Sequence, residues 1–144
     1  MQLIDVMTRN AECIKPSDSV MHAARRMRDM EVGSLPVCDQ NSRLAGMITD
    51  RDITIRCTAD GHDPKEVAVA DIMTPEIIYC FEDDDIHEAA AVMEEHQIRR
   101  LPVLNREKRL VGIVTLGDMA VRGDDYAMNA EALREISEPA RPVR

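Results

Sequence analysis

The chain has 144 residues, of which 44% are hydrophobic and 31% are charged, so it has the length and the apolar content to bury a core. A formal net charge of −9 leaves no basic surplus for a phosphate backbone, and 2% aromatic residues leave few rings for base stacking, which excludes nucleic acid as an expected partner. No apolar run is long enough to cross a bilayer and the start lacks the pattern of a secretory signal, so we expect a cytoplasmic protein without a membrane partner.

The first half of the chain predicts a strand, a helix, a β-hairpin and a second helix. Apolar residues from Val20 to Met30 recur at helical spacing, and Ser19 stands in the position of an N-cap. Two short apolar runs on either side of a polar turn then predict the hairpin. The expected elements are a strand at 13–14, a helix at 20–30, hairpin strands at 35–38 and 44–48, and a helix from about Asp50.

The second half repeats this pattern after a shift of 66 residues, which takes Asp5-Val6-Met7-Thr8 onto Asp71-Ile72-Met73-Thr74. Asp85 takes the place of the helix cap, and together with Glu88 it fits a capping box. The expected elements are a strand at 78–80, a helix at 86–93, hairpin strands at 101–104 and 110–114, and a helix from about Leu116.

The fold class expected from these elements is α+β, with two tandem repeats. Because three strands and two helices make a small core, we expect each copy to bury its open face against the other. A further helix is expected at 124–137, followed by a frayed tail. The chain divides into repeat one at 1–60, a connector at 61–70, repeat two at 71–123, and a C-terminal helix and tail at 124–144.

Four cysteines are widely spaced and form no C-x-x-C pair, which gives little support to a zinc site or a redox motif. Because free cysteines are among the most buried residue types, we predict buried free thiols. A disulfide, or a metal ion held between subunits with one of the four histidines, stays open as an alternative. The cysteines are Cys13, Cys38, Cys57 and Cys80.

Both hairpins end in Thr-x-x-Asp, first as Thr49 with Asp52 and then as Thr115 with Asp118. This spacing is typical of a helix start, where the hydroxyl caps the first turn and the carboxylate lies at the positive end of the helix dipole. The same groups suit a nucleotide, because amides at a helix start bind anions and a carboxylate can accept hydrogen bonds from a ribose diol. Capping and ligand binding both stay open.

A second pair of similar blocks lies at the start of each hairpin. Proline early in a strand lacks an amide donor and indicates an edge position or a strand start. Such an edge can recognise an adenine ring, and nearby arginines can neutralise phosphate, although a solvated surface role suits each arginine equally. The residues are Ser34, Leu35 and Pro36 in the first copy, Arg100, Leu101 and Pro102 in the second, and the additional arginines Arg51 and Arg99.

Together, the Met-Thr, Leu-Pro-Val and Thr-x-x-Asp blocks resemble tandem CBS (cystathionine-beta-synthase-type) domains, the arrangement called a Bateman module, over about residues 4–122. The resemblance implies that the repeats pack as a pseudo-twofold pair, often dimerised into a flat disc. It also implies two clefts between the repeats that bind AMP, ADP, ATP or related adenosyl ligands. Many family members have a second Ser or Thr where this chain has Arg51 and Gly117. The family motif assigns phosphate or ribose contacts to Thr49 and Thr115, and ribose hydroxyl contacts to Asp52 and Asp118.

The function predicted from the sequence is a regulatory, adenine-nucleotide-binding module in signal transduction. We expect a homodimer that requires no cofactor and acts on another protein through a ligand-dependent change. An enzyme is not expected, because no Ser-His-Asp or Cys-His set and no glycine-rich phosphate loop stands at diagnostic spacing. The alternative is a ligand-free structural or interaction protein, with or without a metal ion between its subunits, because capping alone explains the Thr-x-x-Asp pairs.

Overall fold

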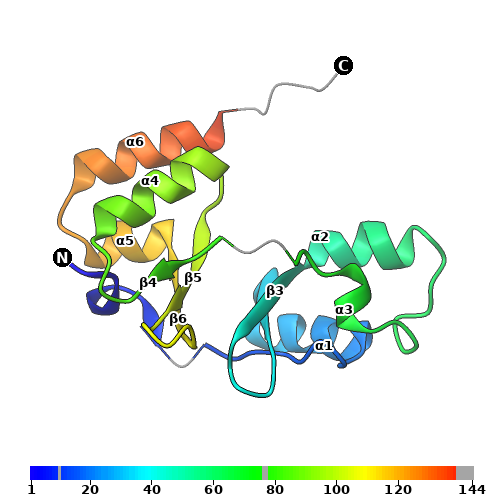
Figure 1. Ribbon diagram of the computed structural model, residues 1–144. Helices are drawn as coiled ribbons and strands as arrows, with labels where there is room; N and C mark the ends of the chain where they lie inside the picture. The colour runs from blue at the N-terminus through cyan, green and yellow to red at the C-terminus, as the bar shows by residue number, and fades with distance from the viewer. Residues whose placement is uncertain (10, 76–77, 139–144) are drawn as a thin grey trace. The chain divides into compact units, whose positions relative to one another are not determined.

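The computed structural model describes residues 1–9, 11–75 and 78–138 (Figure 1), so the tail expected at 139–144 lies outside the described residues. The chain forms two compact units that are each discontinuous in sequence. The N-terminal segment therefore folds with the hairpin of the second repeat. Unit 1 consists of Met1–Asn10, Ile78–Glu107 and Val111–Arg144, and unit 2 consists of Ala11–Ile77 and Lys108–Leu110.

Unit 2 is built around the first hairpin, whose strands β2 (Ser34–Cys38) and β3 (Leu44–Thr49) pair antiparallel with Leu35 opposite Ile48. The hairpin and the amphipathic helix before it are confirmed. The helix after it also begins where expected, and it continues as a π-helix. The helices of this unit are α1 (Val20–Met30), α2 (Asp50–Asp52), the π-helix η2 (Ile53–Thr58) and α3 (Val69–Ile72).

The strand expected at 13–14 is a single bridge rather than a strand. Ile14 pairs in parallel with Val37, and its amide donates to the carbonyl oxygen of Pro36 at 3.0 Å. The next amide along this ladder would come from Pro16, which has no amide hydrogen. The pairing therefore stops after one residue.

Unit 1 contains a four-stranded sheet in the order β1-β6-β5-β4. Strand β1 (Thr8–Arg9) runs antiparallel to β6 (Leu110–Thr115), and β4 (Cys80–Phe81) runs parallel to β5 (Arg100–Leu104). The helices of unit 1 are the 3-10 turn η1 (Leu3–Asp5), α4 (Ile86–His96), α5 (Leu116–Arg122) and α6 (Tyr126–Ser137). The second hairpin is therefore confirmed, and helix α6 confirms the additional C-terminal helix.

The predicted caps of α1 and α4 are confirmed, but the capping box at α4 is not formed as expected. Ser19 accepts a hydrogen bond from the His22 amide at 3.1 Å, and Asp85 accepts one from the His87 amide at 2.9 Å. Glu88, which should return to the cap, instead shares a hydrogen bond with the carboxyl of Asp84, and the nearby Asp84 charge raises the pKa of Glu88. The contact of Glu88 with Asp84 therefore replaces the expected contact of Glu88 with the backbone of Asp85.

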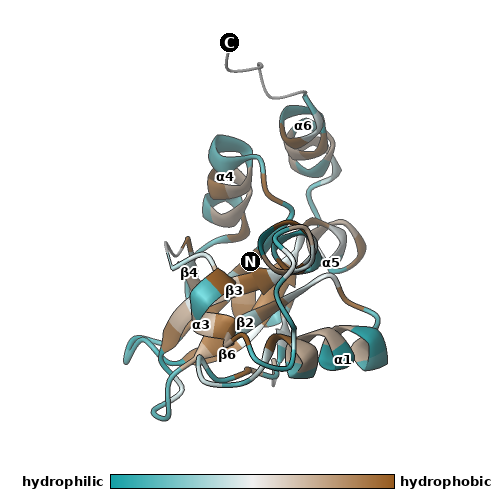
Figure 2. Ribbon diagram, turned by 90° about the vertical axis from the view of Figure 1, so that its right-hand side faces the viewer, coloured by the Kyte–Doolittle hydropathy of each residue, from teal (hydrophilic) through white to brown (hydrophobic). Residues whose placement is uncertain are grey.

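Each unit has its own aliphatic core, as the low aromatic content predicts. Residues of η1 and the segment after it belong to the core of unit 1, where Leu3 and Val6 are fully buried beside Ile86 and Leu101. In unit 2 the core gathers on the inner face of α1 and on the hairpin, whose strands are coloured as hydrophobic in Figure 2. Each core is thus closed by a segment from the other sequence repeat.

Two glycines make room for these exchanged segments. A Cβ at Gly112 would lie 2.7 Å from the carbonyl oxygen of Thr8, and a Cβ at Gly46 would lie 2.7 Å from that of Thr74. Thr74 in turn exchanges backbone hydrogen bonds with Met47, at 2.9 and 3.1 Å. The glycine of each Gly-x-x-Thr block therefore permits close backbone contact with a Met-Thr segment.

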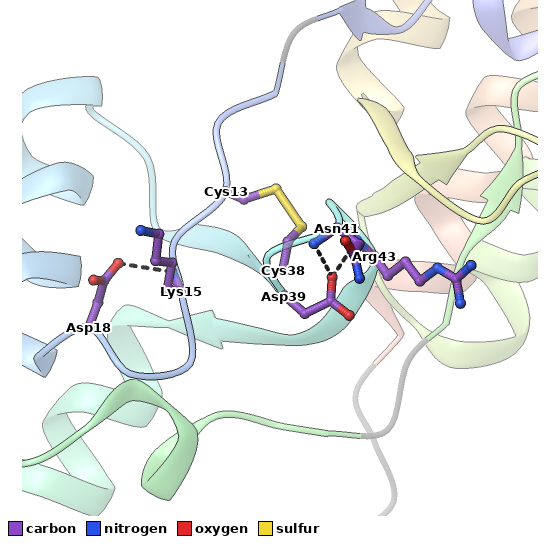
Figure 3. Close-up of a disulfide and its surroundings, with 7 residues drawn as sticks. All are labelled: Cys13, Lys15, Asp18, Cys38, Asp39, Asn41 and Arg43. Atoms are coloured by element: carbon purple, nitrogen blue, oxygen red, sulfur yellow. Dashed lines mark hydrogen bonds between the residues drawn. A yellow bond between two sulfur atoms is a disulfide. The ribbon is translucent and has the colours of Figure 1, made fainter.

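The prediction of free thiols is wrong for two of the four cysteines, because Cys13 and Cys38 form a disulfide (Figure 3). The bridge between Ile14 and Val37 brings their neighbours together, with the Cα atoms of the two cysteines 5.7 Å apart. Sequence spacing alone does not reveal this pairing. Cys57 and Cys80 are buried free thiols, as predicted.

Candidate functional site

The two Thr-x-x-Asp motifs form reciprocal capping boxes at the starts of α2 and α5. Oγ1 of Thr49 accepts a hydrogen bond from the Asp52 amide at 3.0 Å, and Oδ2 of Asp52 accepts one from the Thr49 amide at 2.9 Å. Thr115 and Asp118 make the same two contacts, both at 2.9 Å. The capping interpretation is therefore confirmed, and it occupies one oxygen of each carboxylate.

The first residue of each of these helices also forms a backbone hydrogen bond with the residue just before its hairpin. The Asp50 amide donates to the carbonyl oxygen of Gly33 at 2.9 Å, and the Leu116 amide donates to that of Arg99 at 2.8 Å. In the first hairpin, Ser34 lies directly opposite Thr49. The two blocks singled out in the sequence therefore meet at one end of each hairpin.

The strand edges that the sequence analysis assigned to adenine recognition are paired in part: β4 pairs with Val103 and Leu104 of β5, and Ile14 forms a single bridge with Val37 of β2. Strand β5 lies between β6 and β4, and the carbonyl oxygen of Pro36 in β2 is paired with Ile14. Leu35 and Leu101 are 2% and 0% exposed and belong to the two cores, so their side chains face inward. Pro36 and Pro102 are buried as well.

A pocket of about 500 Å³ in unit 1 brings together three of the predicted residues, Arg99, Arg100 and Thr115. This size is typical of small-molecule sites. The opposite wall comes from α6, which the sequence analysis did not connect with the site. The lining residues are Arg99, Arg100, Thr115, Leu116, Gly117, Ala120, Asn129, Ala130 and Leu133.

Asn129 is the pocket residue that sequence reasoning missed. It is 8% exposed and shares the inward face of α6 with the core residues Ala132 and Ile136. A polar residue in a stripe that is otherwise apolar at helical spacing was the available signal.

The remaining predicted residues do not line this pocket. Asp118 lies half-buried within the capping box, and Arg51 is exposed in α2. Gly117 leaves the pocket open, since an added Cβ would meet only Oγ1 of Thr115, at 3.6 Å. A pocket of about 420 Å³ in unit 2 contains none of the predicted residues and is lined by Arg56, Asp60, His62, Val67, Asp71 and Ile72.

Helix α6 is fastened to α4 at both ends, and the two helices lie side by side in Figure 1. At one end, Nδ1 of His87 contacts Asp85 at 2.6 Å, and Nε2 contacts Asp125, the cap of α6, at 2.9 Å. Hydrogen bonds first to Asp125 and then to Asp85 raise the pKa of His87. At the other end, Gln97 donates to the carbonyl oxygen of Glu138 at 3.1 Å.

The fold and the doubled motifs define a pair of CBS domains. The profile of the CBS domain matches residues 3–57 and 69–122, and the chain belongs to this family. Helix α6 follows the second matched segment. Among the described residues, no helix has the length and apolarity needed to cross a membrane.

The chain is similar to hypoxic response protein 1 of Mycobacterium tuberculosis, with 40% identity over 86% of each chain. The solved structure of hypoxic response protein I, with two coordinated zinc ions, has a TM-score of 0.78 and 40% identity over 84% of this chain and 98% of that one. The structure of CBSX2 in complex with AMP has a TM-score of 0.72 and 30% identity, over 83% of this chain and 93% of that one. The CBS domain pair of MJ0100, with methylthioadenosine and S-adenosylmethionine, has a TM-score of 0.70 and 29% identity, over 84% and 94%.

The described residues of a single chain do not fit a zinc site. They contain no group of three or more His, Cys, Asp or Glu side chains placed to hold a metal ion. Cys13 and Cys38 are joined in the disulfide, and Cys57 and Cys80 are buried in different units.

Proposed function

We propose that the protein is a regulatory module that binds an adenine nucleotide, AMP, ADP or ATP, and that it has no catalytic activity of its own. The observation that carries the proposal is the unit 1 pocket, where Arg99, Arg100 and Thr115 meet beside an apolar wall. The complexes of CBSX2 with AMP and of MJ0100 with adenosyl ligands support this ligand class.

In the proposed complex, the arginines neutralise phosphate and the Thr-x-x-Asp motif contacts ribose. Oδ2 of Asp118 is occupied by the cap, so Oδ1 is the oxygen that accepts from the ribose diol. We propose an equivalent site in unit 2, formed by Ser34, Thr49, Arg51 and Asp52. Strand residues Leu35, Pro36, Leu101 and Pro102 contribute through their backbone, because their side chains are buried.

The ligand acts by favouring one conformation of the pair, which requires different affinities for the two conformations. We propose a cytoplasmic homodimer that transmits this change to a protein partner.

Calorimetric titration with AMP, ADP and ATP tests the proposal, together with mass spectrometry of small molecules released from the purified protein. We expect micromolar binding of at least one nucleotide. Asp118→Ala should weaken it about tenfold or more while lowering the free energy of unfolding by only about 1 kcal/mol. Asp124→Ala, an exposed acidic residue outside both motifs, is the matched control.

A ligand-free structural or interaction protein is the second candidate, because the capping boxes alone account for both Thr-Asp pairs. No heat from any nucleotide, no released ligand and an Asp118→Ala variant that loses only stability would favour it over the sensor. Zinc analysis of the purified protein would then test for a metal between subunits.

A further inference from the structure

Asn129 carries a buried acceptor that lacks a hydrogen-bond partner among the described residues. Its Nδ2 donates to the carbonyl oxygen of Met119 at 3.1 Å, whereas its Oδ1 is buried and unpaired. A buried acceptor without a partner destabilises a fold, because it has lost its hydrogen bonds to water. An acceptor of this kind on a pocket-lining residue points to a ligand group that completes it.

The contact with Met119 determines which hydrogen-bonding group Asn129 offers. If the amide were turned over, Oδ1 would face the Met119 carbonyl oxygen, and two acceptors would repel each other. Nδ2 therefore stays on Met119, and Oδ1 remains the group left for a ligand. The missing partner must then be a hydrogen-bond donor.

We propose that Asn129 is a specificity-determining residue of the unit 1 pocket, whose Oδ1 accepts a hydrogen bond from the 6-amino group of an adenine base. The inference rests on the proposed nucleotide-binding function and adds a residue of α6, outside the matched CBS segments. Leu116, Ala120 and Leu133 supply the apolar wall for the ring, and Arg99 lies in the same pocket for the phosphate.

This arrangement also couples the ligand to α6. Oδ1 is screened from solvent, so the base reaches it only when the residues that cover it shift while Nδ2 keeps its bond to Met119. The same helix is held to α4 by His87 and Gln97, so occupancy of the pocket acts directly on these contacts.

Asn129 should distinguish AMP from IMP. The 6-oxo group of IMP is an acceptor and would face Oδ1 of Asn129, whereas the 6-amino group of AMP is a donor. Sites that hydrogen-bond a substrate group strongly reject analogues that lack it. We expect AMP to bind about tenfold or more tightly than IMP, and purine riboside monophosphate, which has no 6-substituent, to bind as weakly as IMP.

The test is calorimetric titration of the full chain with these three nucleotides, in the wild type and in Asn129→Leu. The substitution should abolish the preference, so that AMP binds no more tightly than IMP or purine riboside monophosphate. Ala127→Leu introduces the same side chain at an exposed position of α6 outside the pocket and should keep the wild-type preference.

Two results would overturn the role of Asn129 while leaving nucleotide binding intact. They are equal wild-type affinities for all three nucleotides, and a preference that survives in Asn129→Leu. The comparison of AMP with purine riboside monophosphate uses wild-type protein alone, so it decides the question even if the variant does not fold. Absence of binding by any adenine nucleotide would instead overturn the proposed function, and the role of Asn129 with it.

Discussion

His87 joins the caps of two helices, since its ring contacts Asp85 of α4 and Asp125 of α6. Hydrogen bonds from the His87 amide and side chain lower the pKa of Asp85 to about 2. The Met128 amide, followed by the His87 side chain, lowers the pKa of Asp125. The N-terminal amine lies 3.5 Å from Asp85 and adds a further positive charge to this cluster.

These shifts predict how the contribution of His87 to stability changes with pH. The pKa of His87 is raised in the folded state. The stabilisation that His87 provides is therefore complete below its ordinary pKa of 6.5, and it is lost as pH rises through the higher pKa of the folded state. Asp85 and Asp125 stabilise the fold fully above their ordinary pKa of 3.8. This stabilisation is lost as pH falls through the lowered pKa values of the folded state. The difference in melting temperature between wild type and His87→Gln should therefore be largest at about pH 4–6 and shrink at alkaline pH. A difference that does not vary with pH would show that His87 acts through packing alone.

The two glycines Gly112 and Gly117 should respond in opposite ways to alanine. Gly112→Ala places a Cβ 2.7 Å from the Thr8 carbonyl oxygen and should lower the free energy of unfolding by about 1–3 kcal/mol. Gly117→Ala meets no such obstacle and should raise it by up to about 1 kcal/mol, because alanine favours the helix. Urea unfolding measures both. Equal effects would contradict the close contact of the Met-Thr segment with β6.

At the scale of elements, helical periodicity predicted α1 and α4, apolar runs around a polar turn predicted the hairpins, and helix start and stop signals predicted α6. These patterns failed for Ile14, whose single bridge depends on Val37 and on the absence of an amide hydrogen in Pro16. The disulfide was missed for the same reason, since it follows from that pairing. In the candidate site, the Thr-Asp caps are local and were predictable, whereas Asn129 is brought to the pocket by the packing of α6.

The disulfide should stabilise unit 2 by restricting the unfolded chain between Cys13 and Cys38, which are 25 residues apart. In the chain-entropy account, a loop of this length is worth about 3.5 kcal/mol. Cys13→Ser should therefore lower the free energy of unfolding by about 2–4 kcal/mol, measured by urea denaturation without reductant. Dithiothreitol should produce a similar loss in the wild type and none in Cys13→Ser. A further loss in the variant would assign the effect to Cys57 or Cys80 instead.

For the whole molecule, the sequence could not predict that the Met-Thr segment at the start of each repeat pairs with the hairpin of the other repeat. Thr8 and Thr74 occupy equivalent places in the two repeats, so the internal alignment cannot say which hairpin each one joins. In the structure, the backbone of Thr8 lies against Gly112 and the backbone of Thr74 lies against Gly46. Each unit therefore needs a segment of both repeats, and neither sequence repeat should fold as an independent piece.

We predict that the proposed homodimer buries Val121 of α5 and Tyr126 of α6, which are 83% and 79% exposed. Burying these two large apolar side chains on association is favourable. Light scattering after size exclusion should give about twice the chain mass of 16.2 kDa. Val121→Glu should raise the dimer dissociation constant about tenfold or more, because the dimer would bury an unpaired charge. Ile55→Glu, at an exposed apolar residue of unit 2, controls for added charge and should stay dimeric. A monomeric wild type would contradict the homodimer, and a dimer unaffected by Val121→Glu would move its interface away from α5.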